Sequence, residues 1–370
     1  GLLADIVDQE EPYPIDLTFS HPEFRLSVDG TVGDITRMKG MQLKLSGQSP
    51  DITRFLKRFG QDIPKLGRVT GEALLYGDIY KPGLDHLKLS IDRGKSLSFK
   101  VSGKVENVLK RRGVDLQISG VTRDQNFLSW LLPNEFPELN HGEVSARLYE
   151  LKSKLKIENL DVQASSQHGL RVELKGVTGI NDFNAKQVFT NMDVAFHFSS
   201  PTTRAAEFFL FDGVPEMGAV KGAARIVSPG KDLAIEDVDI TVGSLPSLGM
   251  TIKGRAGRVP LSPDIPSSEM DFTVVVQSDS TAVIGKLFFN TSVPEMGAIT
   301  INEHFQGSNL KSTSEISFHA GGGDYPNTNA SGMVTLIEKK GELTIEKVDA
   351  RLQISTAGKA GSVKTAEVLT

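Results

Sequence analysis

The groups most able to do chemistry in this chain are a Gly-Lys-Ser triplet and a Ser-x-x-Lys pair. Gly94-Lys95-Ser96 resembles the end of a phosphate-binding loop, but that loop requires a glycine five residues before Gly94, where this chain has Leu89. Ser308 and Lys311 have the spacing of a serine nucleophile and its lysine, without the Ser-Asp-Asn and Lys-Thr-Gly motifs that accompany them. We interpret the first as a hairpin turn and the second as a chance match.

Metal and nucleic-acid chemistry have little support in the composition. The chain of 370 residues has no cysteine, and its net charge of −5 gives no basic footprint for nucleic acid. The basic run Lys110-Arg111-Arg112 indicates a solvated hairpin tip, with a lipid head-group contact as the alternative. Metal-ligand spacing is absent among the seven histidines, which are His21, His86, His141, His168, His197, His304 and His319. The sequence predicts no enzyme, no metal and no cofactor.

A turn of the form apolar-Pro-x-apolar-Gly organises the chain instead, and it occurs four times. Its prolines are 73, 78 and 79 residues apart, which marks a repeat architecture. The proline ends one element, and the residue three positions later can take positive φ at low cost. The structural pairs are Pro64 and Gly67, Pro137 and Asn140, Pro215 and Gly218, and Pro294 and Gly297.

A short amphipathic helix of two to three turns is predicted before each proline turn. In the first copy the apolar positions are at i, i+3, i+4 and i+7: Ile52, Phe55, Leu56 and Phe59. The candidate N-caps of the four helices are Asp51, Asp124, Thr202 or Thr203, and Asp279 or Ser280. Helices this short are marginal alone, so they must dock on an apolar surface.

Between the helices, apolar and polar residues alternate with period two, which predicts strands with one apolar face. The predicted fold is mainly β: an elongated, curled antiparallel sheet of about four repeats of 73–79 residues, each with one short helix. We place a partial N-terminal repeat at 1–50, repeats at 51–123, 124–200, 201–278 and 279–355, and a flexible tail at 356–370. Four small helices cannot cover so large a face, so the remainder must close on itself or meet a ligand.

The strand and turn motifs resemble the AsmA-like proteins of Gram-negative bacteria over roughly 43–276. The resemblance rests on four stretches: Leu45-Ser-Gly-Gln-Ser-Pro-Asp-Ile-Thr-Arg-Phe-Leu56, Ile63-Pro-Lys-Leu-Gly-Arg-Val-Thr-Gly71, Leu97-Ser-Phe-Lys-Val-Ser-Gly-Lys-Val105 and Val114-Asp-Leu-Gln-Ile-Ser-Gly120. It implies a periplasmic β-groove, tethered to the inner membrane by a segment outside this sequence, that carries phospholipid between the membranes and maintains the outer membrane. Candidate partners at its ends are inner- and outer-membrane proteins.

The groove lining is predicted from the alternating apolar positions. These are Leu87, Leu89, Ile91, Leu97, Phe99, Val101, Leu116, Ile118, Leu170, Val172, Leu174, Val194, Phe196, Val238, Ile240 and Val242. Their expected role is a continuous low-polarity surface for acyl chains. The alternative is a structural periplasmic scaffold that transports nothing, with a closed, sandwich-like core.

Overall fold

The prediction of a mainly β chain is confirmed by the computed structural model, which is 70% strand and 8% helical. The residues that it describes are 11–57, 60, 63–132, 138–152, 154–180, 189–210, 214–228, 233–244, 247–259, 268–308, 310–322, 325–339, 342–355 and 364–369. Phe59 and Pro137 lie outside the described residues.

The chain divides into two compact units. Unit 1 comprises residues 1–167 and 174–189, and unit 2 comprises residues 168–173 and 190–370. Strand β10 (Arg171–Ile180) contributes to both. The strands of unit 1 are β1 (Tyr13–His21), β2 (Phe24–Asp34), β3 (Lys39–Ser49), β4 (Arg68–Asp78), β5 (Lys81–Asp92), β6 (Leu97–Asn107), β7 (Arg112–Thr122), β8 (His141–Leu151) and β9 (Lys154–Ser165).

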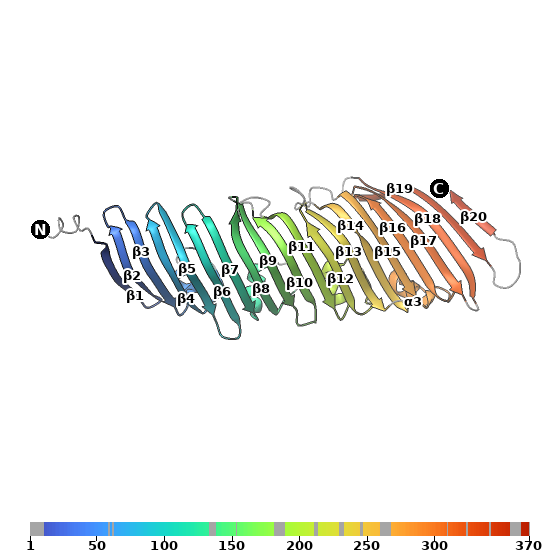
Figure 1. Cartoon of the computed structure of the whole chain (residues 1–370). Coiled ribbons are helices and arrows are strands. Elements are labelled where there is room, and N and C mark those ends of the chain that lie inside the picture. Colours follow the sequence, from blue (N-terminus) through green and yellow to red (C-terminus); the bar gives the residue numbers. More distant parts are fainter. Residues whose placement is uncertain are drawn as a thin grey trace. The chain divides into compact units, whose positions relative to one another are not determined.

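Unit 1 is an antiparallel meander in which each strand pairs with the next along the chain (Figure 1). Turn signals such as Pro82-Gly83 and Arg112-Gly113 lie at the strand connections, where short hairpins are favoured. Among its described strands no ladder joins β1 to β9. The sheet of unit 1 is therefore open.

Unit 2 continues the same connectivity over its own strands, again antiparallel throughout. They are β11 (Phe189–Ser200), β12 (Val220–Val227), β13 (Leu233–Ser244), β14 (Leu248–Val259), β15 (Ser268–Ser278), β16 (Ile299–Gly307), β17 (Lys311–Gly322), β18 (Tyr325–Lys339), β19 (Glu342–Ser355) and β20 (Lys364–Leu369). Strand β20 lies within the stretch that the sequence predicts to be a flexible tail. Its residues pair with β19 in antiparallel register.

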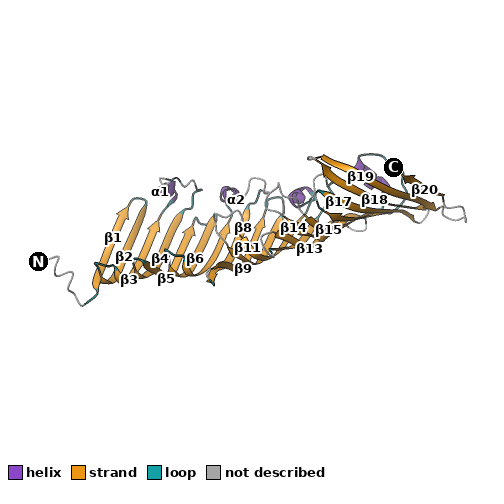
Figure 2. Cartoon of the chain, turned by 90° about the horizontal axis from the view of Figure 1, so that it is seen from above, coloured by secondary structure: helices purple, strands orange, loops and turns teal. Residues whose placement is uncertain are grey.

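Four short helical segments connect strands in the described parts of the chain. They are α1 (Thr53–Lys57), α2 (Gln125–Leu131), η1 (Arg204–Phe209) and α3 (Thr281–Phe289). The third is a 3₁₀ helix, because its backbone bonds run from Ala206 to Thr203 and from Leu210 to Glu207. Of the first helix, the structure describes the five residues Thr53–Lys57. In unit 1, α1 and α2 lie at the same end of the strands (Figure 2).

Each unit has its own cluster of buried apolar side chains. In unit 1 the cluster is small and centres on Val32, Met41 and Leu43. In unit 2 it is larger and combines buried strand residues, such as Val220 and Met250, with residues from the two helices: Ala206, Phe209, Leu210, Ile284 and Phe288. The helices of unit 2 therefore dock on its sheet through their apolar stripes, as expected for helices too short to be stable alone.

Candidate apolar binding face

The predicted lining residues of unit 1 lie on one face of the sheet. Leu89 is opposite Val101, and Val101 is opposite Ile118. In the neighbouring rows, Ile91 is opposite Phe99, and Leu87 and Leu116 are both opposite Gly103. Because directly opposed residues point to the same side of a sheet, these positions form one apolar surface across β5, β6 and β7.

Burial along this surface depends on position within the strand. At the two ends of the β6–β7 pair, Leu97 and Val114 are 2% and 8% exposed. Midway, Phe99, Val101 and Ile118 are only half-buried. Among the described residues of unit 1, no second sheet packs on this face (Figure 2). The middle of the strands thus presents an apolar band that protein covers only in part.

A glycine interrupts the band where two strands approach closely. Gly103 has φ of 142°, and a Cβ there would collide with the carbonyl oxygen of Asp115 on β7. Only glycine adopts this conformation without strain. Gly103 therefore keeps β6 and β7 in register beneath Leu87 and Leu116.

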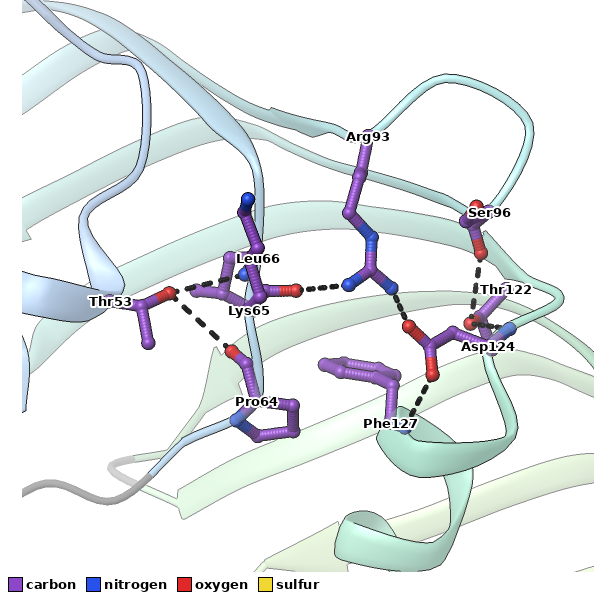
Figure 3. Close-up of polar contacts among 9 residues, drawn as sticks. All are labelled: Thr53, Pro64, Lys65, Leu66, Arg93, Ser96, Thr122, Asp124 and Phe127. Carbon is purple, nitrogen blue, oxygen red and sulfur yellow. Dashed lines mark hydrogen bonds and ion pairs between the residues drawn. The ribbon is translucent and has the colours of Figure 1, made fainter.

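Threonine hydroxyls clamp the helices to the proline turns. In unit 1 the Thr53 hydroxyl lies 3.5 Å from the carbonyl oxygen of Pro64 and accepts a hydrogen bond of 3.2 Å from the Leu66 amide (Figure 3). In unit 2 the Thr281 hydroxyl donates to the carbonyl oxygen of Pro294 at 2.9 Å and accepts from the Met296 amide at 2.7 Å. Each hydroxyl satisfies backbone groups that the turn would otherwise leave buried and unpaired.

Arg93 joins the first proline turn to the second helix. Its Nη1 donates to the Lys65 carbonyl oxygen at 2.7 Å, and its other terminal nitrogen forms an ion pair with Asp124 (Figure 3). Asp124 is the N-cap of α2 and accepts from the Phe127 amide at 3.1 Å, which confirms the predicted cap. The two helices of unit 1 are thus positioned by one charge-assisted network. Leu128 of α2 is buried below it.

In unit 2 the predicted lining residues are more deeply buried than in unit 1. Leu170, Val172, Val194 and Val242 are all less than a tenth exposed, and three of them belong to or border the apolar cluster under η1 and α3. Phe196 and Ile240 are half-buried and pack against that cluster, and Val238 is half-buried too. Leu174 of unit 1 is half-buried. The protein itself fills much of this part of the face.

One carboxylate lies on the apolar side of unit 2. Glu303 is opposite Val274 on β15 and Ile316 on β17, and the Ser314 hydroxyl donates a hydrogen bond to it. Ser312 and Ser314 are themselves buried on the same side. Glu303, Ser312 and Ser314 therefore form a polar patch within the apolar surface of unit 2.

The opposite, polar face of unit 1 is hollowed. A depression of about 930 Å³ is lined mostly by polar side chains, among them Lys88, Ser90, Lys100, Ser102, Gln117 and Ser119. Leu89, Val101 and Ile118 lie between these rows and border the same depression. Sequence alternation assigns residues to a face correctly here, but it carries no signal for which face is concave.

Ion pairs hold the strands together on this polar side. Arg147 binds Asp115 through two bonds of 2.8 and 2.9 Å and binds Glu158 at 2.7 Å. Hydrogen bonding to Arg147 lowers the pKa of Asp115, although partial burial opposes this. In unit 2, Arg225 binds Asp193 through two bonds of 2.7 and 2.8 Å, and this lowers the pKa of Asp193. Such bidentate pairs fix geometry more than they add stability.

The Gly-Lys-Ser triplet and the Ser-x-x-Lys pair lie at strand connections. Gly94 and Lys95 belong to the β5–β6 turn, where the Gly94 amide donates to Asp92 at 2.6 Å. The Ser308 hydroxyl bonds to the backbone of Lys311, whereas the Lys311 ammonium lies 3.3 Å from Glu346. Among the described residues, no group of three histidine or carboxylate side chains is placed to hold a metal ion, and no helix is long and apolar enough to cross a membrane.

Comparisons with family models, with curated proteins and with solved structures give no match to this chain. Sequence reasoning missed the Arg93 tie and the threonine clamps. The Thr203 hydroxyl likewise accepts a hydrogen bond from the Met217 amide at 3.0 Å. A sequence signal for the clamps does exist, because Thr203 and Thr281 precede the prolines of Pro-Glu turns by 12 and 13 residues.

Proposed function

We propose that the apolar face of this chain binds lipid acyl chains and that the chain is a periplasmic carrier segment of the AsmA-like type, moving phospholipid between the inner and outer membranes. The observation that carries the proposal is the half-buried apolar band of unit 1, which includes Leu89, Val101 and Ile118. When a ligand covers apolar surface that is partly in water, the bound state is stabilised by about 25 cal/mol for each Å² removed from water. An aliphatic chain matches a band that has no fixed polar groups along it.

Recurring backbone features support the partial N-terminal repeat and the first three of the four repeats that this proposal includes. Positive φ close to 150° recurs every 73 to 78 residues at Gly30, Gly103, Gly176 and Gly254. Left-handed φ near 52° recurs with the same spacing at His86, Asn159 and Asp237, each beside a β-bulge. Bulges at equal positions turn equal strands in the same way, which favours a regularly curled sheet.

The ion pairs recur in the same manner. Asp193, Arg225 and Glu236 each lie 78 residues after Asp115, Arg147 and Glu158, and both sets form the same three-strand arrangement. A charged network repeated at fixed offset is difficult to explain unless the strands around it repeat as well. Passive sliding along the band would be the transport mechanism.

A structural scaffold is the second candidate, and unit 2 supplies the observation that favours it. Val220, Val242 and Ala320 are fully buried there by other residues of the protein. A face filled in this way has less room for lipid. Under this alternative the apolar band of unit 1 would be a peripheral part of a sheet that serves only as structural support.

Native mass spectrometry with lipid extraction tests the proposal. We expect phospholipids to co-purify with the chain from a Gram-negative host. Val101→Asp should reduce the number of phospholipids per chain at least severalfold, because an acyl chain that covers the carboxylate would remove a charge from water without pairing it. The matched control is Ser102→Asp on the polar face, which should retain lipid. A folded wild-type chain that carries no lipid would contradict the proposal and favour the scaffold.

A further inference from the structure

Four hairpin turns lie next to one another at the end of the unit 1 strands opposite to α1 and α2. They comprise residues 34–39, 78–81, 106–112, and 150–152 with 154, and we call their exposed ends the hairpin edge. Backbone bonds connect them, since the Ile79 amide donates to the Met38 carbonyl oxygen at 3.1 Å and the Val108 amide donates to the Pro82 carbonyl oxygen at 2.9 Å. The edge is thus one ordered surface.

Large apolar side chains project from this edge into solvent. Tyr80 is 80% exposed and Leu109 is 65% exposed, and three further apolar residues, Ile79, Val108 and Leu151, are each exposed by 39% or more. Scattered exposed apolar residues are ordinary, but here they occur at three successive tips. A row of protruding apolar tips is the kind of surface that marks an interaction site.

The charge of the hairpin edge is opposite to that of the whole chain. Its turns contain eight lysines and arginines against four carboxylates, whereas the whole chain has a net charge of −5. Arg37 and Arg112 are paired with Asp34 and Glu150 of the same edge, at 3.9 and 2.7 Å. Among the described residues no ion pair engages the other six, which are Lys39, Lys81, Lys110, Arg111, Lys152 and Lys154.

Three of the four carboxylates of the edge are occupied by its own turns, and the fourth, Glu106, lies exposed at 3.9 Å from Lys104 of β6. Asp78 accepts from the amides of Tyr80 and Lys81 at 2.9 and 2.8 Å. Asp34 accepts from the Arg37 amide at 3.0 Å, and Glu150 binds Arg112 and the Gly113 amide. These acidic groups shape the turns and offset two of the arginines. The outermost surface therefore combines apolar tips with unpaired cations.

We propose that the hairpin edge docks on the surface of an anionic lipid bilayer. Tyrosine and leucine tips suit the interfacial region, where an amphipathic ring or short apolar chain is buried while its neighbours stay wet. Each lysine or arginine near an anionic surface adds about 1 kcal/mol of attraction. This docking concerns the strand ends, so it does not depend on lipid binding along the apolar band.

Vesicle flotation with the full chain tests the docking. We expect binding to phosphatidylcholine vesicles that contain phosphatidylglycerol, weak binding to phosphatidylcholine alone, and loss of binding in high salt. Lys110→Gln with Arg111→Gln should weaken binding about 30-fold. The matched control is Lys65→Gln with Lys95→Gln, which removes two exposed charges at the opposite strand end and should leave binding unchanged.

Tryptophan fluorescence identifies the contacting end of the strands. Trp130, the single tryptophan, is half-exposed on α2 at the end opposite to the hairpin edge. In a Trp130→Phe background, Leu109→Trp should shift its emission to the blue when anionic vesicles are added. Equal binding to neutral and anionic vesicles, equal effects of the two double variants, absence of vesicle binding, or a blue shift of Trp130 in the wild-type chain would each overturn the proposal.

Discussion

At the scale of single residues, Gly103 is a position where the backbone admits only glycine without strain. Gly103→Ala should destabilise unit 1 by about 1–3 kcal/mol, because its φ of 142° and the nearby Asp115 carbonyl oxygen both exclude a methyl group. Urea unfolding followed by Trp130 fluorescence measures this loss. Gly47→Ala is the control, since a Cβ at Gly47 meets its nearest neighbour at an ordinary 3.7 Å. Equal effects of the two substitutions would contradict the argument.

Asp115 predicts an acid-sensitive contribution at the same scale. Its pKa is lowered in the folded state, chiefly by hydrogen bonding to Arg147. Its stabilising effect is therefore complete above the unfolded carboxyl pKa and is lost as the pH falls through the lowered, folded value. The urea midpoint of unit 1 should decrease as the pH falls through this acidic range. In the Arg147→Gln variant the midpoint should decrease less steeply with falling pH. An unchanged slope in the variant would show that other carboxylates dominate.

At the scale of elements, the threonine clamp decides whether a short helix stays docked. Thr281 is 2% exposed and serves both Pro294 and Met296. Thr281→Val keeps the side-chain shape but leaves these backbone groups unpaired, which should cost about 1–3 kcal/mol. Hydrogen exchange at the Met296 amide should accelerate accordingly. Thr281→Ser retains the hydroxyl and should protect this amide almost as well as the wild type does.

At the scale of the molecule, unfolding should not be a single transition. The described strands contact mainly their sequence neighbours, so cooperativity must pass from strand to strand. Trp130 reports unit 1, whereas far-ultraviolet circular dichroism reports the strands of both units. We expect the two signals to give different urea midpoints. Coincident curves would indicate that the two units unfold together.

The sequence by itself determined the local features of this protein. Period-two alternation assigned Leu89, Val101 and Ile118 to one face of the sheet. The sequence also anticipated the Asp124 cap. These features depend on backbone geometry within a few residues, where side-chain chemistry has direct effect.

Only the tertiary structure decided which faces are filled and which groups meet. Sequence gives Val101 and Val242 the same alternation, yet Val101 is half-buried and Val242 is fully buried under unit 2's own side chains. Arg93 meets Asp124, and the basic hairpin tips align in one edge, because meander connections bring residues dozens of positions apart into contact. The burial of a side chain depends on all of its neighbours in space. A periodic pattern therefore predicts which face of the sheet a residue lies on, but not whether other parts of the protein pack over that face.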